Sequence, residues 1–435
     1  MGASAVTRLH QLELFGLYAL VFSLPIMESP KHFAIVLFSV GALGWRLLQK
    51  PIGWRKPDTF EWLLFSMWLV SLASTLANWP MEPGIRGFEN LSCILFLFWA
   101  LYRNTYKESQ IRLFLWILIA AVMLGLVEGL WEWKSGIRGH LEFHSAGVVT
   151  QSAIYLGISM FLMFGIFLDT ASGFSTYVRV VMAVCLLFSL FCLIVMGNRG
   201  SVLAVIVIMG LLSLTLFHNK RLRLALGITL SITIIMTISA YIGTENSILT
   251  QRIKHLTSNV SKHGLKLDDI SGPNDRLRFD HWMVGYTQAI QGGHMLLGIG
   301  PRNFPSIKVD QLKFSKPLTT YPSVWQVPSH AHNLFLTKWC EEGILGLTAF
   351  ILFLLYVAFN LFRHRPSPEN IHWTWIACLG ALIMPIVAGS FNSPFINEFA
   401  LLSMMLLGIS MGRLKKKQLI NSATYNDYEI FSKPS

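Results

Sequence analysis

Residues 177–217 read YVRVVMAVCLLFSLFCLIVMGNRGSVLAVIVIMGLLSLTLF. Apolar side chains fill almost all of this stretch on either side of a short polar segment at 197–200. Each apolar arm, 177–196 and 201–217, is close to the ~20 residues that a helix needs to cross a ~30 Å hydrocarbon core. The stretch therefore predicts two membrane-spanning helices joined by a tight hairpin, with Arg199 at or just inside the membrane boundary.

The rest of the chain has the same character. Over 435 residues it is 53% hydrophobic and 13% charged, with a mean hydropathy of +0.52. So little polar surface could not keep a globule of this size in water. We therefore predict an all-α polytopic membrane protein with about twelve transmembrane helices, in the windows 12–28, 32–49, 60–78, 88–102, 111–131, 152–169, 177–196, 201–217, 222–243, 334–362, 372–391 and 396–412.

Basic residues gather in alternate segments between these windows. With the N-terminus in the cytoplasm, the cytoplasmic segments contain Arg46, Lys50, Arg55, Lys56, Arg103, Lys107, Arg112, Lys220, Arg221, Arg223, Arg363, Arg365, Arg413, Lys415, Lys416 and Lys417. The opposite short loops contain only Lys31, Arg86, Lys134, Arg138 and Arg199. Because cytoplasmic loops carry an excess of Lys and Arg, both termini are predicted to be cytoplasmic. The net charge of +12 therefore reflects basic residues that set the membrane topology, and it does not indicate nucleic-acid binding.

Four regions follow from this topology. We expect transmembrane helices 1–9 in residues 1–243, a large extracytoplasmic loop in 244–333, helices 10–12 in 334–414 and a cytoplasmic tail in 415–435. A loop as long as 244–333 is usually functional. Apolar residues at helical spacing in 248–256 and 279–297 predict amphipathic helices within it, separated by a turn at 271–273.

Three polar places interrupt the apolar pattern, and the predicted topology puts all three on the extracytoplasmic face. The first is the hairpin around Arg199, which lies between Gly197 and Gly200. An arginine at the membrane boundary can extend to lipid phosphates, or it can hold the phosphate oxygens of a bound ligand in a bidentate grip. The flanking glycines allow a ligand to approach closely, which favours the second reading.

The second place is the segment from Arg276 to Trp282 together with residues 297–304. Two arginines at a spacing of two lie on different sides of a helix, so we expect one of them to contact a ligand. Arg278 is favoured because it lies four residues before Trp282, on the same side of a helix, whereas Arg276 is expected to be solvated or paired with an aspartate. The glycines of 297–304, a stretch that includes Arg302, predict a tight turn and not a dinucleotide site.

The third place opens an apolar run with His330, His332 and Asn333. A histidine at the membrane boundary is well placed to accept a proton from a sugar hydroxyl, although a structural role is the more common one for a single histidine. Two histidines at a spacing of two also raise the question of a metal ion. Asp275 and Asp280 are too far along the chain to complete a ligand motif, and the five cysteines lack metal-ligand spacing, so we expect no metal.

The histidine run carries a resemblance. His332 and Asn333, followed after nine residues by Gly343 and after two more by Gly346, resemble the signature of the bacterial O-antigen ligase and polymerase superfamily. That superfamily comprises WaaL-type ligases, Wzy-type polymerases and PglL-type protein glycosyltransferases. The match is specific in its spacing.

Two upstream segments extend the resemblance over essentially the whole chain. Arg278 with Trp282, and the stretch 297–304, resemble the family pattern that precedes the histidine. Residues 198–200 resemble its arginine-bearing extracytoplasmic loop. The resemblance implies a GT-C-like membrane fold in the bacterial inner membrane, with the active site facing the periplasm.

The resemblance also implies an activity. The expected reaction is O-antigen ligation, in which a glycan moves from an undecaprenyl-diphosphate-linked donor to a lipid A-core acceptor. Arg199 and Arg278 would hold the diphosphate, and His332 would activate the acceptor hydroxyl. We expect no cofactor or metal, because fixed arginines can offset charge on a diphosphate leaving group. Direct attack would invert the anomeric centre. Further substrate-binding positions are expected at Arg276, Trp282, Arg302, His330 and Asn333.

Other functions remain open at this level. A Wzy-type polymerase shares the membrane layout, and a PglL-type enzyme usually carries a further C-terminal extracytoplasmic region that is not seen after residue 417. A lipid-linked glycan transporter would also have about twelve spans. It would be expected to show two similar halves with broken helices at matching places, and no such symmetry is present.

Overall fold

The structure of the chain is a computed structural model that describes residues 3–48, 56–80, 82–104, 106–145, 147–216, 273–314, 318, 329–391 and 394–431. Every regular element within these residues is a helix, which confirms the predicted fold class. Nine of the described helices are long and apolar enough to cross a membrane, and α14 is a shorter apolar helix. The chain is thus a multi-pass α-helical membrane protein.

The described residues form twelve α-helices and two 3-10 helices. Their bounds are α1 Ala3–Ile26, α2 Glu28–Leu48, α3 Thr59–Ala77, α4 Glu82–Arg103, α5 Glu108–Lys134, α6 Val149–Leu168, α7 Thr176–Met196, α8 Arg199–Leu216, α12 Pro273–Gln291, η1 Phe304–Ser306, η2 Val309–Gln311, α13 Leu334–Arg363, α14 Trp373–Gly389 and α15 Asn397–Phe431. Eleven of the twelve predicted windows fall on these helices. The window 222–243 and the amphipathic segment 248–256 lie outside the described residues.

Helix α6 is the centre of the bundle, where it packs against α7, α14 and α15. Its most apolar window is 94% buried inside the protein. A helix that is apolar on all sides has no face for solvent and is stable only when neighbours surround it. Helices such as α5, α7 and α8 expose large apolar side chains, as lipid-facing helices do.

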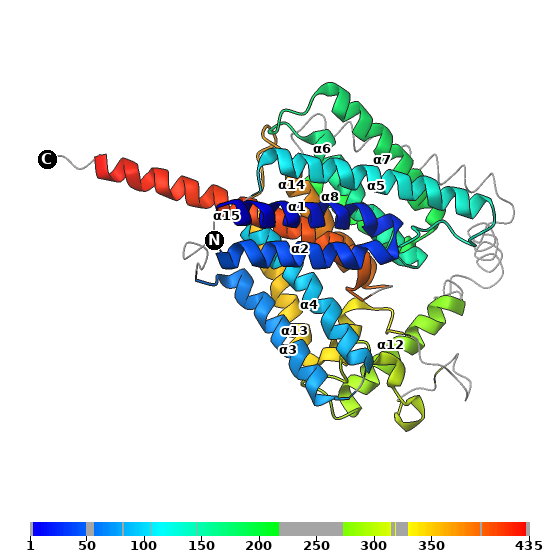
Figure 1. The fold of residues 1–435 in the computed structure, drawn as a ribbon. Coiled ribbons are helices and arrows are strands. Elements are labelled where there is room, and N and C mark those ends of the chain that lie inside the picture. Colours follow the sequence, from blue (N-terminus) through cyan, green and yellow to red (C-terminus); the bar gives the residue numbers. More distant parts are fainter. Residues whose placement is uncertain are drawn as a thin grey trace.

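Helices α1 and α2 form a close antiparallel pair along one side of the bundle (Figure 1). A Cβ atom at Gly16 would lie 2.4 Å from the backbone nitrogen of Phe38, and one at Gly41 would lie 2.4 Å from that of Glu13. Small residues that let two backbones approach this closely are a common basis for helix association in membranes.

The hairpin between α7 and α8 is as tight as the sequence predicts. Helix α7 ends at Gly197, which has the left-handed φ of 67° that glycine adopts without steric cost. The side chain of Asn198 then accepts a hydrogen bond from the backbone of Ser201 at 2.8 Å and caps α8. Arg199 is consequently the first residue of α8, and it is exposed.

The two ends of the bundle differ in content. The start of α1 and the end of α15 lie at the same end of the bundle in Figure 1, and α12 lies at the other. We call the first the basic end and the second the α12 end.

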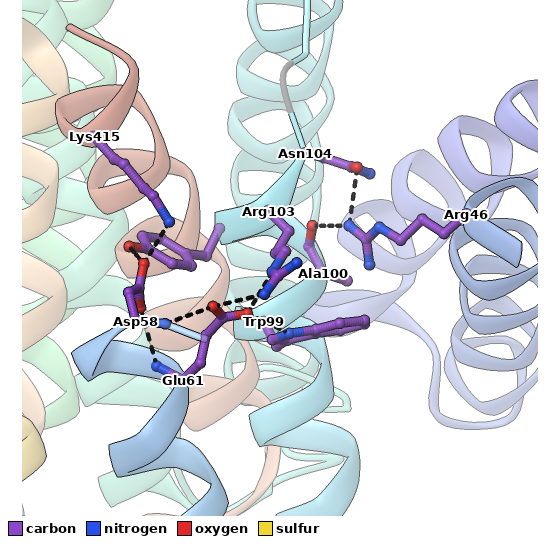
Figure 2. Close-up of polar contacts among 9 residues, drawn as sticks. Arg46, Asp58, Glu61, Trp99, Ala100, Arg103, Asn104 and Lys415 are labelled. Atoms are coloured by element: carbon purple, nitrogen blue, oxygen red, sulfur yellow. Dashed lines mark hydrogen bonds and ion pairs between the residues drawn. The ribbon is translucent and has the colours of Figure 1, made fainter. Parts of the chain in front are cut away.

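Charged residues expected in loops at the basic end prove to lie on helices and to be paired (Figure 2). Arg103 of α4 forms an ion pair with Glu61 of α3, and its Nη2 donates to Glu61 Oε2 at 2.8 Å. Trp99 Nε1 donates to Glu61 Oε1 at 2.9 Å. Lys415 of α15 pairs with Asp58, the N-cap of α3, so these contacts join three helices.

A second set of contacts continues toward α1 and α2. Arg46 donates to the carbonyl of Ala100 at 2.7 Å and to Asn104 Oδ1 at 2.9 Å (Figure 2). Asn104 in turn donates to Glu13, a fully buried carboxylate that also accepts from Tyr106 at 2.7 Å. A buried carboxylate is tolerated only with such partners. We call these two sets of contacts the basic-end network.

Lys31, also expected in a loop, belongs to the first turn of α2 at the α12 end. It is buried and forms an ion pair with Glu398 of α15. Interior burial is possible because the two charges compensate each other.

Candidate functional site

Three of the predicted site residues come together where α12 meets the segment before α13. His332 stacks on His281 of α12, with ring centroids 5.1 Å apart and an interplanar angle of 19°. The ring of His330 lies 4.5 Å from that of His332. Trp282 Nε1 donates to the carbonyl of His332 at 3.4 Å. We call His281, Trp282, His330 and His332 the histidine cluster.

The backbone around His332 is specified by the start of α13. Asn333 is the N-cap, and its Oδ1 accepts from the backbone of Leu336 at 2.9 Å. Its Nδ2 donates to the carbonyl of Ser390 at 2.9 Å. Both polar atoms of Asn333 therefore have structural partners in the protein, and Asn333 positions the residue before it.

His332 itself has a φ of 51°. A residue with a Cβ atom is uncommon in this left-handed region, and such conformations gather at functional sites, where the surrounding structure compels them. Here the capped helix on one side and the ring contacts on the other hold the conformation. The imidazole is thereby fixed at the N-terminal end of a long helix, where the helix dipole favours anions.

His281 is 2% exposed, and this environment changes its titration. The pKa of His281 is lowered to about 4, mainly by burial and also by electrostatic interaction with His332 and Arg278, against the opposing effect of Asp280. His281 is therefore neutral at physiological pH. The same interaction places Arg278 close enough to the histidine cluster to act on it electrostatically.

Of the two glycines in the predicted motif, Gly343 has a clear structural role. Helix α13 is interrupted at Gly343, which has a φ of 69° and a ψ of −174°. A Cβ atom there would lie 2.1 Å from the carbonyl oxygen of Leu296. The predicted span 334–362 is thus two helical segments joined at a break, and a turn of the preceding loop occupies that break.

Backbone hydrogen bonds hold this turn in place. Ile299 and Gly300 donate to the carbonyls of Cys340 and Glu341 at 3.0 and 2.8 Å, and Ile344 donates to that of Met295 at 2.9 Å. The tight turn predicted from the glycines of 297–304 is confirmed, with positive φ at Gly298 and Gly300. The turn attaches the loop to α13 at the Gly343 break. The first helical segment of α13 separates this attachment from His332.

Arg302 lies at this attachment and not at the histidine cluster. It has a φ of 58°, and its guanidinium donates to Asn397 Oδ1 of α15 at 3.3 Å. The backbone amides of Arg302 and Phe304 face the carboxylate of Glu341. Arg302, Glu341 and Glu342 line a small cavity of about 40 Å³ together with Lys338, which pairs with Glu342.

The sequence reasoning did not single out Glu341, Glu342 or His281 as site residues. A signal existed for the glutamates, because carboxylates inside an apolar run are costly and therefore usually have a role. His281 offered no comparable signal, since its burial depends on residues about 50 positions further along the chain.

The ligand contacts expected of Arg199 and Arg276 stay predictions. Arg199 begins α8, which packs against α6, α7 and α14, and its convergence with Arg278 on one ligand stays a prediction. Arg276 belongs to the first turn of α12, and its side chain lies outside the described residues. Arg278 and Trp282 are four residues apart on α12, which places them on one side of that helix as predicted.

A group of possible metal ligands lies elsewhere, near the end of α5. In the described part of the chain, Glu128, Glu132 and His144 bring ligand atoms within 4.8 Å of one another. Arg138 occupies part of this group, with its Nε 2.8 Å from Glu132 Oε2. The positive charge of Arg138 makes the group a poor site for a cation.

Comparison with known proteins shows a similarity over part of the chain. A family model described as O-antigen ligase matches residues 183–351, which include Arg199, Arg278, His332, Gly343 and Gly346. We call residues 183–351 the matched segment. The histidine cluster and the Gly343 break both lie inside it.

The chain is also similar to a protein of Haemophilus influenzae that is described as uncharacterized. The two are 23% identical over 396 residues, which cover 86% of this chain and 90% of the relative. This similarity therefore extends beyond residues 183–351 to most of the length of both chains.

Proposed function

We propose that the protein is an O-antigen ligase that transfers a glycan from undecaprenyl diphosphate to the lipid A-core oligosaccharide at the periplasmic face of the inner membrane. The observation that supports this most is His332, held in a left-handed conformation at the N-terminus of α13 and stacked on the neutral His281. This arrangement lies inside residues 183–351, the segment that matches the O-antigen ligase family model.

In the proposed reaction, the oxygen of an acceptor hydroxyl attacks the anomeric carbon of the donor sugar. His332 takes the hydroxyl proton, and the bond from the anomeric carbon to the diphosphate oxygen breaks. Arg278 and Arg199 offset the charge that develops on the departing undecaprenyl diphosphate, because a guanidinium binds phosphate oxygens in a bidentate fashion. A single displacement of this kind inverts the anomeric configuration.

The neighbouring residues of the histidine cluster support these roles. Trp282 bonds the carbonyl of His332, so it positions the base, and its aromatic ring offers a face on which a sugar can stack. His281 is neutral and packs against the imidazole without adding a fixed positive charge next to it. His330 and Arg276 are proposed to contact the substrates.

The test is the identity of the product. Purified protein, undecaprenyl-diphosphate-linked glycan and lipid A-core are combined with a chelator, and the products are separated by size and by acceptor. Glycan attached to lipid A-core supports the ligase. Lengthening of the lipid-linked glycan identifies a polymerase, glycan on a protein acceptor identifies a protein glycosyltransferase, and a glycan that only changes leaflet identifies a transporter.

The arginine roles have a matched control on the chain. Arg278→Gln and Arg199→Gln are expected to lower the transfer rate by at least about tenfold, as loss of charge stabilisation in the transition state does. Arg86→Gln removes the same charge from an exposed pair with Glu82 and should leave the rate unchanged. Equal rates for all three variants would contradict the proposed diphosphate site.

A further inference from the structure

A second cavity lies at the basic end, at the opposite end of the bundle from α12. Its volume is about 790 Å³, within the range of ~300–1,000 Å³ typical of small-molecule sites. It is formed where the end of α4, the start of α5, the 364–372 loop, the start of α14 and the middle of α15 meet. We call it the basic-end cavity.

Apolar side chains form part of the cavity interior. Leu101, Leu361, Trp375 and Ile409 line it, and each is at most 5% exposed. The lining also includes polar side chains, among them Asn104 and Tyr106, which both donate to the buried Glu13 of the basic-end network (Figure 2 shows Asn104). The cavity therefore offers a ligand both hydrophobic and polar contact.

The mouth of the cavity is strongly basic. Lys107, Arg365, Arg413 and Lys416 line it, against the single carboxylate of Glu108. Glu108 is already bonded to Arg413 Nη2 at 2.7 Å. Within the described residues, Lys107, Arg365 and Lys416 form no ion pair, and Arg413 Nη1 is buried without a hydrogen-bond partner.

These four cations differ from three others at the basic end, whose charges are paired or hydrogen-bonded. Arg103, Arg46 and Lys415 all have acidic or carbonyl partners within the basic-end network. The four cations at the cavity mouth have a single carboxylate, that of Glu108, in the cavity lining. A ligand that carries negative charge at the mouth and apolar groups inside would satisfy both parts of the cavity.

We infer that the basic-end cavity binds an anionic lipid, with the phosphate headgroup at Lys107, Arg365, Arg413 and Lys416 and the upper acyl chain against Leu101, Leu361 and Ile409. Basic pockets between transmembrane helices on the cytoplasmic side are suited to such headgroups. A free phosphate ion would leave the apolar interior unused. Since α15 contributes two of the four cations, the bound lipid would also join α15 to α5 and to the 364–372 loop.

The test measures binding of short-chain lipids to the purified protein in neutral detergent by native mass spectrometry. The probes are dihexanoyl phosphatidylglycerol, dihexanoyl phosphatidylcholine and inorganic phosphate. We expect saturable binding of phosphatidylglycerol alone. Equal binding of phosphatidylcholine, or displacement of phosphatidylglycerol by an equal concentration of inorganic phosphate, would overturn the assignment to an anionic lipid.

Two double variants with the same change in charge locate the site. Lys107→Gln with Arg365→Gln removes two exposed cations from the mouth and is expected to weaken phosphatidylglycerol binding by about tenfold or more. Lys56→Gln with Arg363→Gln removes two exposed cations that do not line the cavity, and should change binding by less than about twofold. Equal losses in both would show that general surface charge, and not the cavity, attracts the lipid.

Discussion

The basic-end network and the histidine cluster use similar residue types for different purposes. At the basic end, Arg103 and Glu61 lie on neighbouring transmembrane helices and compensate each other inside the bundle. In the histidine cluster, His332 lies just before α13 and has an unfavourable φ. Two contacts from α12 hold it there, the stacked ring of His281 and the hydrogen bond from Trp282 to the His332 carbonyl. The first arrangement stabilises the bundle, whereas the second holds the proposed base in place.

The comparison shows that a charge in an apolar region is not by itself evidence of a catalytic role. Arg103 is more buried than Arg199, yet its partner Glu61 and its helix position account for it fully. Functional sites are better indicated by residues in conformations that the fold must enforce. His332 meets that criterion, and Arg103 does not.

The largest effect on stability is expected from Glu61→Gln. The variant leaves the guanidinium of Arg103, whose side chain is 15% exposed, without its counter-charge, and breaking a largely buried pair in this way costs up to about 3–5 kcal/mol. The thermal midpoint of the purified protein should fall markedly, while Glu82→Gln, in the exposed pair with Arg86, changes it little. Adding Arg103→Met to Glu61→Gln should restore part of the loss. Failure to do so would mean that the pair is not the unit of stability.

Gly343→Ala tests the break in α13. The added methyl group would meet the carbonyl of Leu296, and alanine is strained at a φ of 69°, so we expect a loss of at least ~2 kcal/mol and faster proteolysis of the 294–300 turn. Gly210→Ala on α8 is the control, because a Cβ atom there meets open space. Similar stability in the two variants would contradict the proposed attachment of the loop to α13.

The smallest effect is a pH dependence from His281. Its pKa is lowered to about 4 in the folded protein, so the unfolded chain takes up a proton first as the pH falls through ~6.5. Folding stability should therefore decrease between about pH 6.5 and pH 4, by ~1 kcal/mol at pH 5.5. His281→Gln should remove this part of the dependence, measured as the thermal midpoint from pH 5 to pH 8. Parallel curves for wild type and variant would show that His281 is not buried as neutral imidazole.

Length and hydropathy were sufficient to place eleven described helices, because a membrane imposes the same length on every span. The 197–200 hairpin was equally predictable, since no other backbone fits so short a polar segment between two spans. Neither argument depends on which helices are neighbours.

The features that the sequence did not reveal all depend on distant pairs. The contact between Arg103 and Glu61 spans 42 positions, and that between Lys31 and Glu398 spans 367. The break at Gly343 exists because a turn from the preceding loop occupies it. Hydrophobic periodicity reports the environment of a residue but not the identity of its partner. For the same reason, the left-handed conformation of His332 could not be foreseen from its neighbours.

The central claim is that the histidine cluster performs the chemistry and the basic-end network maintains the fold. The most direct test compares His332→Asn with Glu61→Gln in one reconstituted transfer assay, normalised to folded protein, alongside thermal midpoints. Asparagine tolerates the left-handed backbone of His332 but cannot accept the proton. We predict that the transfer rate of His332→Asn falls by about 10²-fold or more while its thermal midpoint stays unchanged. We predict that the thermal midpoint of Glu61→Gln falls while the transfer rate per folded molecule stays unchanged. Full activity in His332→Asn, or a rate loss in folded Glu61→Gln as large as that in His332→Asn, would contradict the account.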